Sequence, residues 1–204
     1  MDYTSHLCKV KKLKKLISGR EPFKLKRRKN ICIYLCASIM SQQLSTKVAI
    51  VIYNRFLNLF NGKEPSSQQI LDMPLATLRS IGLSNAKASY VHNVARFALE
   101  KGMEVKKLNR MSNDELMEYF TEIKGVGRWT TEMLLMFALG REDVFAVDDL
   151  GIQNAMTGLY NLDSIDKKKL KVEMLRISEK WSPYRTYACL HLWHWKDNVP
   201  AAKV

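Results

Sequence analysis

Two glycines separated by one residue, Gly125-Val126-Gly127, stand between two stretches of helical periodicity and constrain the fold of this 204-residue chain more than any other feature. Residues 115–122 are predicted to form one helix, and residues 129–139 a second helix with apolar side chains on a continuous face. Glycine has no side chain and can adopt positive φ. The pattern therefore predicts a tight hairpin between two helices.

Such a hairpin can present backbone N–H groups to an anion. Those around Gly125 and Gly127, together with the positive end of the second helix, can point at a phosphate that approaches closely. This geometry recognises a nucleic-acid backbone rather than its bases. A bare Gly-x-Gly is equally compatible with an ordinary helix connection, so the phosphate interpretation depends on the rest of the sequence.

Helix start and stop signals recur along the chain, whereas strand-like alternation is nowhere sustained. Ser112 opens a capping box with Glu115, and Gly140 suits the position after a helix end. Asp163 or Ser164 is the expected cap of a run to about residue 180, and Ser182-Pro183 is expected to open the last helix. The predicted helices cover residues 45–60, 74–82, 84–101, 112–122, 129–139, 163–180 and 182 onward. These signals predict an all-α protein.

The net charge of +13 is unevenly distributed. Residues 1–30 hold 11 Lys and Arg against 2 Asp and Glu, whereas the other 174 residues carry a net charge of only +4. We divide the chain into a basic N-terminal segment (1–29), a main domain (30–197) and a C-terminal tail (198–204). The lysines of the basic segment either strengthen nonspecific DNA binding through counterion release or form a solvated helix face.

Several features indicate a soluble intracellular protein, in the cytoplasm or nucleoid, or in the nucleus if the source is eukaryotic. The sequence has no run of about 20 apolar residues and no signal-peptide core. Its four scattered cysteines are interpreted as small buried residues in a reducing compartment. Tyr187, His191 and His194 have a spacing that resembles a metal stripe, but core or hydrogen-bonding roles are favoured because a third ligand is missing. Trp193 and Trp195 are interpreted as packing residues.

Beyond the hairpin, Val147-Asp148-Asp149-Leu150-Gly151 follows at about one helix's length. Together with residues 123–131, this stretch resembles the helix-hairpin-helix (HhH-GPD) DNA glycosylases, specifically their alkylpurine, or 3-methyladenine, branch. The family has Pro where this chain has Lys124. Further resemblance lies in residues 41–47, 82–88 and 181–188, so the likeness extends over about residues 30–197.

The resemblance implies an all-α fold of two lobes with a DNA-binding cleft between them. It also implies base excision repair of alkylated purines, such as 3-methyladenine or 7-methylguanine, by base flipping and hydrolysis of the N-glycosidic bond. The expected partner is double-stranded DNA with damaged bases, bound by a monomer without a membrane partner. Two alternatives remain: a non-catalytic helix-hairpin-helix DNA-binding module, and a bifunctional glycosylase and lyase for oxidised bases.

Asp149 matches the catalytic carboxylate of the family, whereas Asp148 is interpreted as a helix cap. From the residues alone, both carboxylates could be caps. Breaking an N-glycosidic bond develops positive charge on the deoxyribose. A fixed carboxylate stabilises that charge and can orient or deprotonate the attacking water. A cationic purine leaves as a neutral base, so one carboxylate suffices without a partner acid.

The resemblance also implies a base pocket of Trp129, Met133, Trp181 and Tyr184. Glycosylases that also cleave the DNA backbone have a Lys at the position of Trp129, and its amine forms a Schiff base. Trp129 therefore favours base release by water. Its indole either stacks on a flipped base or anchors its helix, and Met133 stands where some relatives have an aromatic residue. Trp181 and Tyr184 match positions near the flipped nucleotide, where π faces attract a cationic base.

The remaining expected sites contact DNA or hold a cation. Gln42 and Gln43 lie in a loop that resembles the family's DNA probe, with Gln43 at the wedge position that fills the gap left by the base. The alternative is the polar start of a surface helix. The other expected DNA-contacting residues are Ser84, Lys87, Lys124, Gly125, Gly127, Arg128 and Thr130. Backbone carbonyls of Thr121, Ile123 and Val126 are expected to hold Na⁺ or K⁺, without an organic cofactor or an iron–sulfur cluster.

Overall fold

The computed structural model of the chain describes residues 2–163 and 165–198, and the regular structure within these ranges is entirely helical. The prediction of an all-α protein is confirmed. Ser164 and all of the expected C-terminal tail except Asn198 lie outside the described residues. No described helix combines the length and the apolar character that crossing a bilayer requires.

The chain forms two compact units. The central unit comprises residues 27–134, and the terminal unit combines residues 1–26 with those from 135 onward. Helix α10 (Arg128–Phe137) belongs to both, because the division lies after Leu134. The DNA-binding cleft implied by the family stays a prediction.

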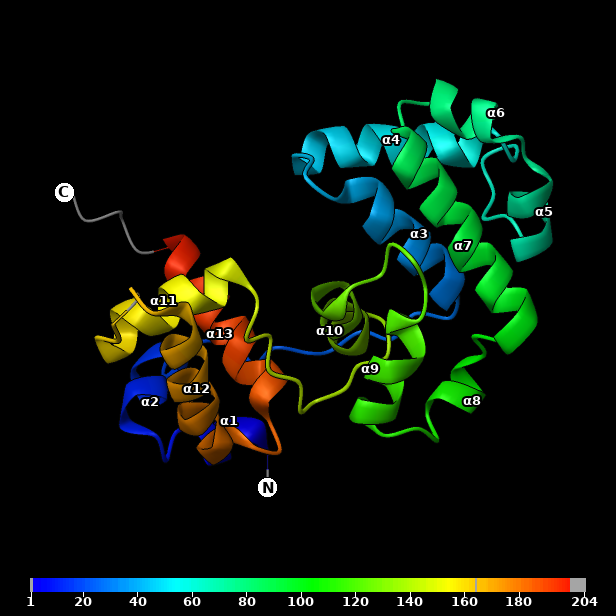
Figure 1. The fold of residues 1–204 in the computed structure, drawn as a ribbon. Helices are drawn as coiled ribbons and strands as arrows, with labels where there is room; N and C mark the ends of the chain where they lie inside the picture. Colours follow the sequence, from blue (N-terminus) through cyan, green and yellow to red (C-terminus); the bar gives the residue numbers. More distant parts are fainter. Residues whose placement is uncertain (1, 164, 199–204) are drawn as a thin grey trace. The chain divides into compact units, whose positions relative to one another are not determined.

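In the central unit, long α7 packs against α3, α5 and α6, while α4 packs against α3 (Figure 1). Buried side chains of Leu35, Ile39, Phe56 and Val91 form the core between these helices. The helices of this unit that precede α10 are α3 (Ile31–Ser41), α4 (Thr46–Asn58), α5 (Ser67–Asp72), α6 (Leu75–Ser80), α7 (Asn85–Lys101), α8 (Val105–Leu108) and α9 (Asn113–Thr121).

Serine caps begin the helices that position the candidate site. The Ser45, Ser84 and Ser112 hydroxyls each accept a hydrogen bond from the backbone N–H three residues later. The carboxylate of Glu115 accepts in return from the backbone N–H of Ser112, which completes the expected capping box. These starts were predictable because each cap and its partner lie within one turn.

In the terminal unit, α13 packs against α2 and α11 (Figure 1). The unit's core includes the buried side chains of Leu13, Ile152, Met174 and Leu192. Its helices other than the end of α10 are α1 (Tyr3–Leu7), α2 (Lys11–Ile17), α11 (Leu150–Tyr160), α12 (Lys167–Ser178), the 3₁₀ helix η1 (Glu179–Trp181) and α13 (Arg185–Asn198).

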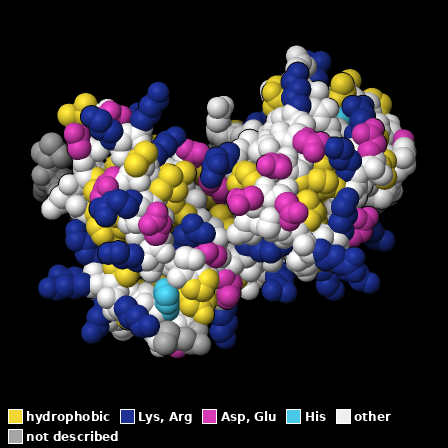
Figure 2. All heavy atoms as spheres, turned by 60° about the horizontal axis from the view of Figure 1, so that its bottom comes forward, with side chains coloured by type: hydrophobic (Ala, Val, Ile, Leu, Met, Phe, Trp, Pro, Cys, Tyr) yellow, Lys and Arg dark blue, Asp and Glu magenta, His cyan; other side chains and the backbone are white. Residues whose placement is uncertain are grey.

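Residues 1–26 of the basic N-terminal segment belong to this unit, whereas residues 27–29 belong to the central unit. Leu7, Leu13 and Leu16 are buried, and the ring of Tyr3 stacks on Tyr187 with 4.0 Å between centroids. Burial of these apolar side chains holds α1 and α2 against the C-terminal helices. The exposed lysines of α2 thus lie on a packed helix rather than on a free arm. Figure 2 shows Lys and Arg side chains scattered over the face drawn, with Asp and Glu between them.

Two predicted helix starts were wrong. Asp166 caps α12 by accepting from the backbone N–H groups of Lys168 and Lys169, whereas Asp163 accepts from Ile165 in the preceding turn. Helix α13 begins at Arg185 rather than at Ser182-Pro183. The Arg185 backbone N–H donates to Asp143, 42 residues earlier in the chain. A cap from so distant a segment leaves no local sequence signal.

Candidate functional site

The Gly-x-Gly connection is a tight hairpin anchored to the central unit. Ile123 and Val126 are buried, and the Val126 N–H donates to the Ile123 carbonyl at 2.9 Å. From α7, the Asn93 side-chain amide donates to the Lys124 carbonyl at 3.1 Å. These contacts hold the hairpin in one conformation between α9 and α10, as the sequence predicts.

The two glycines of the hairpin serve different purposes. Gly125 has φ of 108°, and a Cβ there would lie 2.3 Å from Cγ of Tyr90, so the fold itself requires glycine. Gly127 lies outside the left-handed region, and a Cβ there would have no described atom within 4 Å. Neither backbone conformation nor packing explains glycine at 127. Close approach of a group from outside the chain would explain it.

The side chains around Gly127 differ in accessibility. Lys124, Arg128 and Trp129 are exposed, and Arg128 also forms an ion pair with Glu132 at 3.1 Å in the first turn of α10. Thr130 is only 4% exposed. A DNA contact from Thr130 would therefore come from its backbone, whereas the others can offer side chains.

The expected probe loop joins α3 to α4. Gln43 is exposed and adopts φ of 59°, which turns the chain sharply after Gln42. The Lys87 ammonium, from α7, donates to the carbonyls of Met40 at 3.0 Å and Gln42 at 2.6 Å. Burial lowers the pKa of Lys87. The Lys87 ammonium thus holds the loop in place, and the Ser84 hydroxyl caps α7. A DNA contact from either residue stays a prediction.

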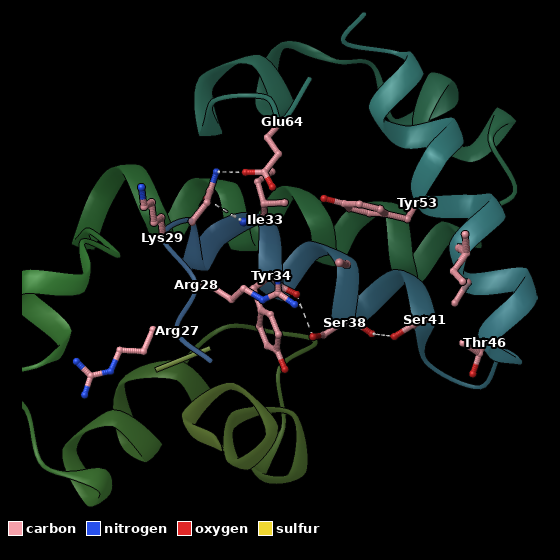
Figure 3. Close-up of a pocket in the computed structure, with 14 residues that line it drawn as sticks. Arg27, Arg28, Lys29, Ile33, Tyr34, Ser38, Ser41, Thr46, Tyr53 and Glu64 are labelled. Atoms are coloured by element: carbon pink, nitrogen blue, oxygen red, sulfur yellow. Dashed lines mark hydrogen bonds between the residues drawn. The ribbon is translucent and has the colours of Figure 1, made fainter. Parts of the chain in front are cut away.

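A groove of about 720 Å³ runs beside this loop, between one face of α3 and one face of α4 (Figure 3). Tyr53 points into it from α4, and Glu64, which accepts from the Asn30 amide, lies near its upper end. The basic run 27–29 lines one end of the groove, while Thr46 lies at the opposite end beside the probe loop. The sequence shows the basic run, but it does not show that residues 27–29 line the same groove as α4.

In the terminal unit, Asp149 is the N-cap of α11. Its Oδ1 accepts the backbone N–H of Ile152 at 2.9 Å and the indole N–H of Trp193 at 2.8 Å. The residue is half-buried. Two N–H donors from different helices fix the orientation of this carboxylate.

The neighbouring Asp148 is not the cap, which corrects the prediction from the sequence. Its carboxylate forms an ion pair with Lys171 of α12. Both partners are partly exposed, so the pair contributes about 0–1 kcal/mol to stability. The two adjacent carboxylates are thus distinguished by their partners: Asp149 accepts two N–H groups, and Asp148 faces an ammonium.

Comparison with known proteins decides the family. A family model described as the HhH-GPD superfamily base excision DNA repair protein matches residues 36–183. This chain belongs to the HhH-GPD superfamily. DNA-3-methyladenine glycosylase 1 of Schizosaccharomyces pombe is 38% identical to it over 185 residues, which cover 90% of this chain and 80% of that relative.

Solved HhH-GPD structures agree with this assignment over nearly the whole chain. The S. pombe 3-methyladenine DNA glycosylase Mag1, in complex with abasic DNA, matches with a TM-score of 0.84 and 34% identity over 100% of both chains. A DNA-3-methyladenine glycosidase from Bacillus halodurans matches with a TM-score of 0.85 and 32% identity, covering 97% of this chain and 90% of that one. The helices described above are therefore those of the HhH-GPD fold.

The HhH-GPD base-pocket residues predicted from the sequence lie on both units. Trp129, 43% exposed, and half-buried Met133 lie on α10 in the central unit, where the Tyr34 hydroxyl donates to the Met133 carbonyl. Tyr184 of the terminal unit is partly exposed, beside the rings of His6 and Tyr187.

Trp181 does not fit the predicted stacking role. It is fully buried, and its ring contacts Phe145 and Tyr160 at centroid distances of 5.6 and 6.4 Å. Its large apolar surface fills the core of the terminal unit, so no face is open to a base. The sequence motif located the segment correctly but could not show which way the indole turns.

Two residues with a clear place in the site were missed. Leu44 follows Gln43 in the probe loop and is 38% exposed. An apolar side chain at such a tip is of the kind that wedges between base pairs. Trp193, interpreted as a packing residue, donates its indole N–H to Asp149. The available signal was weak, because a half-buried indole usually finds a hydrogen-bond partner but the sequence does not name it.

The remaining polar groups of residues 2–163 and 165–198 form no second catalytic or metal centre. Among the described residues, no three His, Cys, Asp or Glu side chains group as a metal site. Cys32 and Cys36 are buried free thiols on α3. His191 is buried beside the ring of Phe23, and burial, with the positive charge of Arg20, lowers its pKa to about 4. This His is therefore neutral and part of the core.

Proposed function

We propose that this protein is a monofunctional DNA glycosylase that flips alkylated purines of the 3-methyladenine and 7-methylguanine type and hydrolyses their N-glycosidic bonds. The observation that carries the proposal is Asp149, held by two N–H donors at the start of α11 in a chain of the HhH-GPD superfamily. Trp129 in the first turn of α10 supplies no amine for Schiff-base chemistry. The relatives named 3-methyladenine glycosylases support the same substrate class.

The proposed chemistry places negative charge where positive charge develops. As the bond between deoxyribose and base lengthens, the sugar acquires oxocarbenium character, which the Asp149 carboxylate stabilises. Its orientation is fixed before the reaction by the Ile152 and Trp193 donors, so no reorganisation is needed. The carboxylate also orients or deprotonates the attacking water. A cationic alkylpurine departs neutral, which explains how a single carboxylate suffices.

The proposed partner is double-stranded DNA with a damaged base, bound by one copy of the chain. The backbone around Gly127, with the exposed side chains of Lys124 and Arg128, approaches a phosphate. Gln43 and Leu44 enter the duplex at the gap that the flipped base leaves. Base flipping loses stacking in the duplex, and contact with the exposed ring of Trp129 offsets that loss.

A monovalent cation on the hairpin carbonyls of Thr121, Ile123 and Val126 is part of the proposal. The Ile123 carbonyl accepts one hydrogen bond, from Val126, and its second lone pair can ligate a cation. Backbone carbonyls are a suitable donor set for Na⁺ and K⁺. When bound, the cation would add positive charge beside the phosphate site.

The direct test uses duplexes that each contain one lesion: 7-methylguanine, 3-methyladenine, hypoxanthine or 8-oxoguanine. We expect base release from the two cationic purines, much slower release of hypoxanthine, and strand breaks only after alkali. Borohydride should trap no protein–DNA adduct. An efficiently trapped adduct would establish the lyase alternative, and binding without any base release would establish the non-catalytic module.

Asp149→Asn tests the catalytic residue. Asn is as good a helix cap as Asp, so α11 and the fold should persist, while removal of the charge should slow single-turnover excision about 100-fold or more. Asp148→Asn is the matched control, because it removes an adjacent carboxylate that faces Lys171. Near-wild-type excision by Asp149→Asn, or an equal loss in both variants, would contradict the assignment.

A further inference from the structure

Trp193 connects three parts of the terminal unit at the candidate carboxylate. Its Nε1 donates to Asp149 Oδ1 at 2.8 Å, and its ring lies 6.0 Å from that of Phe137 at the end of α10. The same carboxylate oxygen accepts the Ile152 N–H. The end of α10, the start of α11 and the middle of α13 therefore meet at one indole.

Gly151 makes this meeting possible. A Cβ at 151 would lie 3.0 Å from Asp149 Oδ1, 3.0 Å from Trp193 Cδ1 and 3.1 Å from Trp193 Nε1. Gly151 is the second residue of α11 and lacks positive φ, so its backbone does not require glycine, which is a poorer helix former than alanine. The close approach of the carboxylate and the indole accounts for glycine at a position where the helix itself disfavours it.

We infer that Trp193 is a positioning residue for the reaction, which acts by holding the Asp149 carboxylate in the orientation that faces the developing charge. The inference rests on the proposed function. A helix cap needs only the Ile152 bond, and with that bond alone the carboxylate could turn about its side-chain torsions. A second donor from α13 removes this freedom. Such support determines whether a charged group lies within the small distance that catalysis tolerates.

The inferred positioning role depends on the N–H group of the Trp193 indole rather than on the volume of its ring. Trp193→Phe keeps an aromatic ring beside Phe137 and Gly151 but removes the donor. Trp195→Phe is the matched control on the same helix, because Trp195 packs beside Gly158, where a Cβ would be 3.7 Å from its ring. Both variants lose one indole from α13, and only the first loses a hydrogen bond to Asp149.

Single-turnover release of 7-methylguanine and affinity for an abasic-site duplex should be measured for both variants. We expect Trp193→Phe to excise about 10- to 100-fold more slowly at unchanged affinity, because a misplaced catalytic group loses rate rather than binding. Trp195→Phe should remain within about twofold of the unmodified protein in both measurements. Unchanged excision by Trp193→Phe, or equal slowing by both variants, would overturn the inference.

A double-mutant cycle separates positioning from a general loss of structure. In an Asp149→Asn background, Trp193→Phe should slow the residual excision far less than it does alone, since both changes act through one carboxylate. Independent, multiplying effects would overturn the inference. Gly151→Ala, which crowds both groups, should reproduce the rate loss if Trp193→Phe folds poorly.

A spectroscopic measurement tests the hydrogen bond between Trp193 and Asp149 independently of whether the protein releases bases. In ¹⁵N-labelled protein, the indole N–H resonance of Trp193 should shift on Asp149→Ala while that of Trp195 stays in place. An unmoved Trp193 resonance would refute the hydrogen bond itself. If the unmodified protein releases no base although this shift occurs, the proposed function fails and the positioning role fails with it.

Discussion

Gly127→Ala isolates the proposed contact between the hairpin and a phosphate. The new methyl group would meet no described atom within 4 Å, and the backbone at 127 lies outside the left-handed region. Gly to Ala at such a position stabilises a protein by about 0.4–1 kcal/mol through the unfolded chain. For a domain of this size we expect the Tm to rise by about 1–4 °C.

The same methyl group stands where a phosphate would approach the backbone. Loss of one hydrogen bond to a charged group costs about 1.5–3 kcal/mol, which is roughly a 10- to 100-fold rise in Kd. The effect should be equal on undamaged and abasic duplexes, because phosphate contacts position the protein without recognising sequence. The variant is therefore expected to be more stable and to bind more weakly.

Gly125→Ala is a poor test of the phosphate contact, because it also disturbs the fold of the hairpin. Its Cβ would overlap the Tyr90 ring, which costs about 1–3 kcal/mol as overpacking, and the positive φ adds about 1–3 kcal/mol. Weak binding by that variant would reflect a damaged hairpin. Gly158→Ala is the better control, since its Cβ makes only ordinary contact on α11. It should raise the Tm and leave affinity unchanged.

Fluorescence anisotropy with labelled duplexes, together with thermal melting, measures both quantities. A Gly127→Ala protein with the raised Tm and unchanged Kd would refute the phosphate role of residue 127. A variant with a lowered Tm would instead show that the hairpin needs glycine there for folding.

Three further predictions follow from charge and burial. The unfolded chain protonates His191 below its ordinary pKa of 6.5, whereas the folded chain does so only near 4, so Tm should fall as the pH drops through this window. His191→Phe should flatten that fall, and an unchanged pH profile would disprove it. Replacing the exposed Lys11, Lys14 and Lys15 with Gln should reduce the slope of log affinity against log salt by about 0.9 for each phosphate that the variant no longer neutralises. An unchanged slope would show that these lysines do not contact DNA. The triple variant is preferable to deletion of α2, because it keeps the buried leucines of that helix. Exchanging K⁺ and Na⁺ for tetramethylammonium at equal ionic strength should weaken binding to undamaged duplex, and equal affinity would contradict the carbonyl cation site.

The sequence predicted those features whose partners lie nearby along the chain. Ser45, Ser84 and Ser112 cap helices through bonds that span three residues. The hairpin was predictable for the same reason, because Gly125 and its buried neighbours lie within one connection. Patterns of this kind involve residues within a single turn, so they do not depend on the tertiary structure.

Features that depend on distant partners were not predictable. From the sequence, Lys87 is expected to be a surface cation that contacts DNA. In the structure its ammonium donates to the carbonyls of Met40 and Gln42, more than forty residues earlier in the chain. Trp181 and Trp193 illustrate the opposite errors. The first matched a pocket position and is buried in the core, while the second was interpreted as a packing residue and contacts Asp149. A single sequence shows the residue type but not the direction of the side chain.

The proposed catalytic role of Asp149, added to its observed role as the cap of α11, would explain why the family motif and the local helix signal coincide at one residue. The N-terminus of α11 supplies N–H donors for a carboxylate, so helix capping and the proposed catalysis require the same group. A carboxylate that served only as a cap would need no second donor. Trp193 and the glycine at 151 that admits it are therefore the features that distinguish the proposed catalytic arrangement from an ordinary helix start. Because Asn preserves the cap while removing the charge, the two roles of residue 149 can be separated by one substitution.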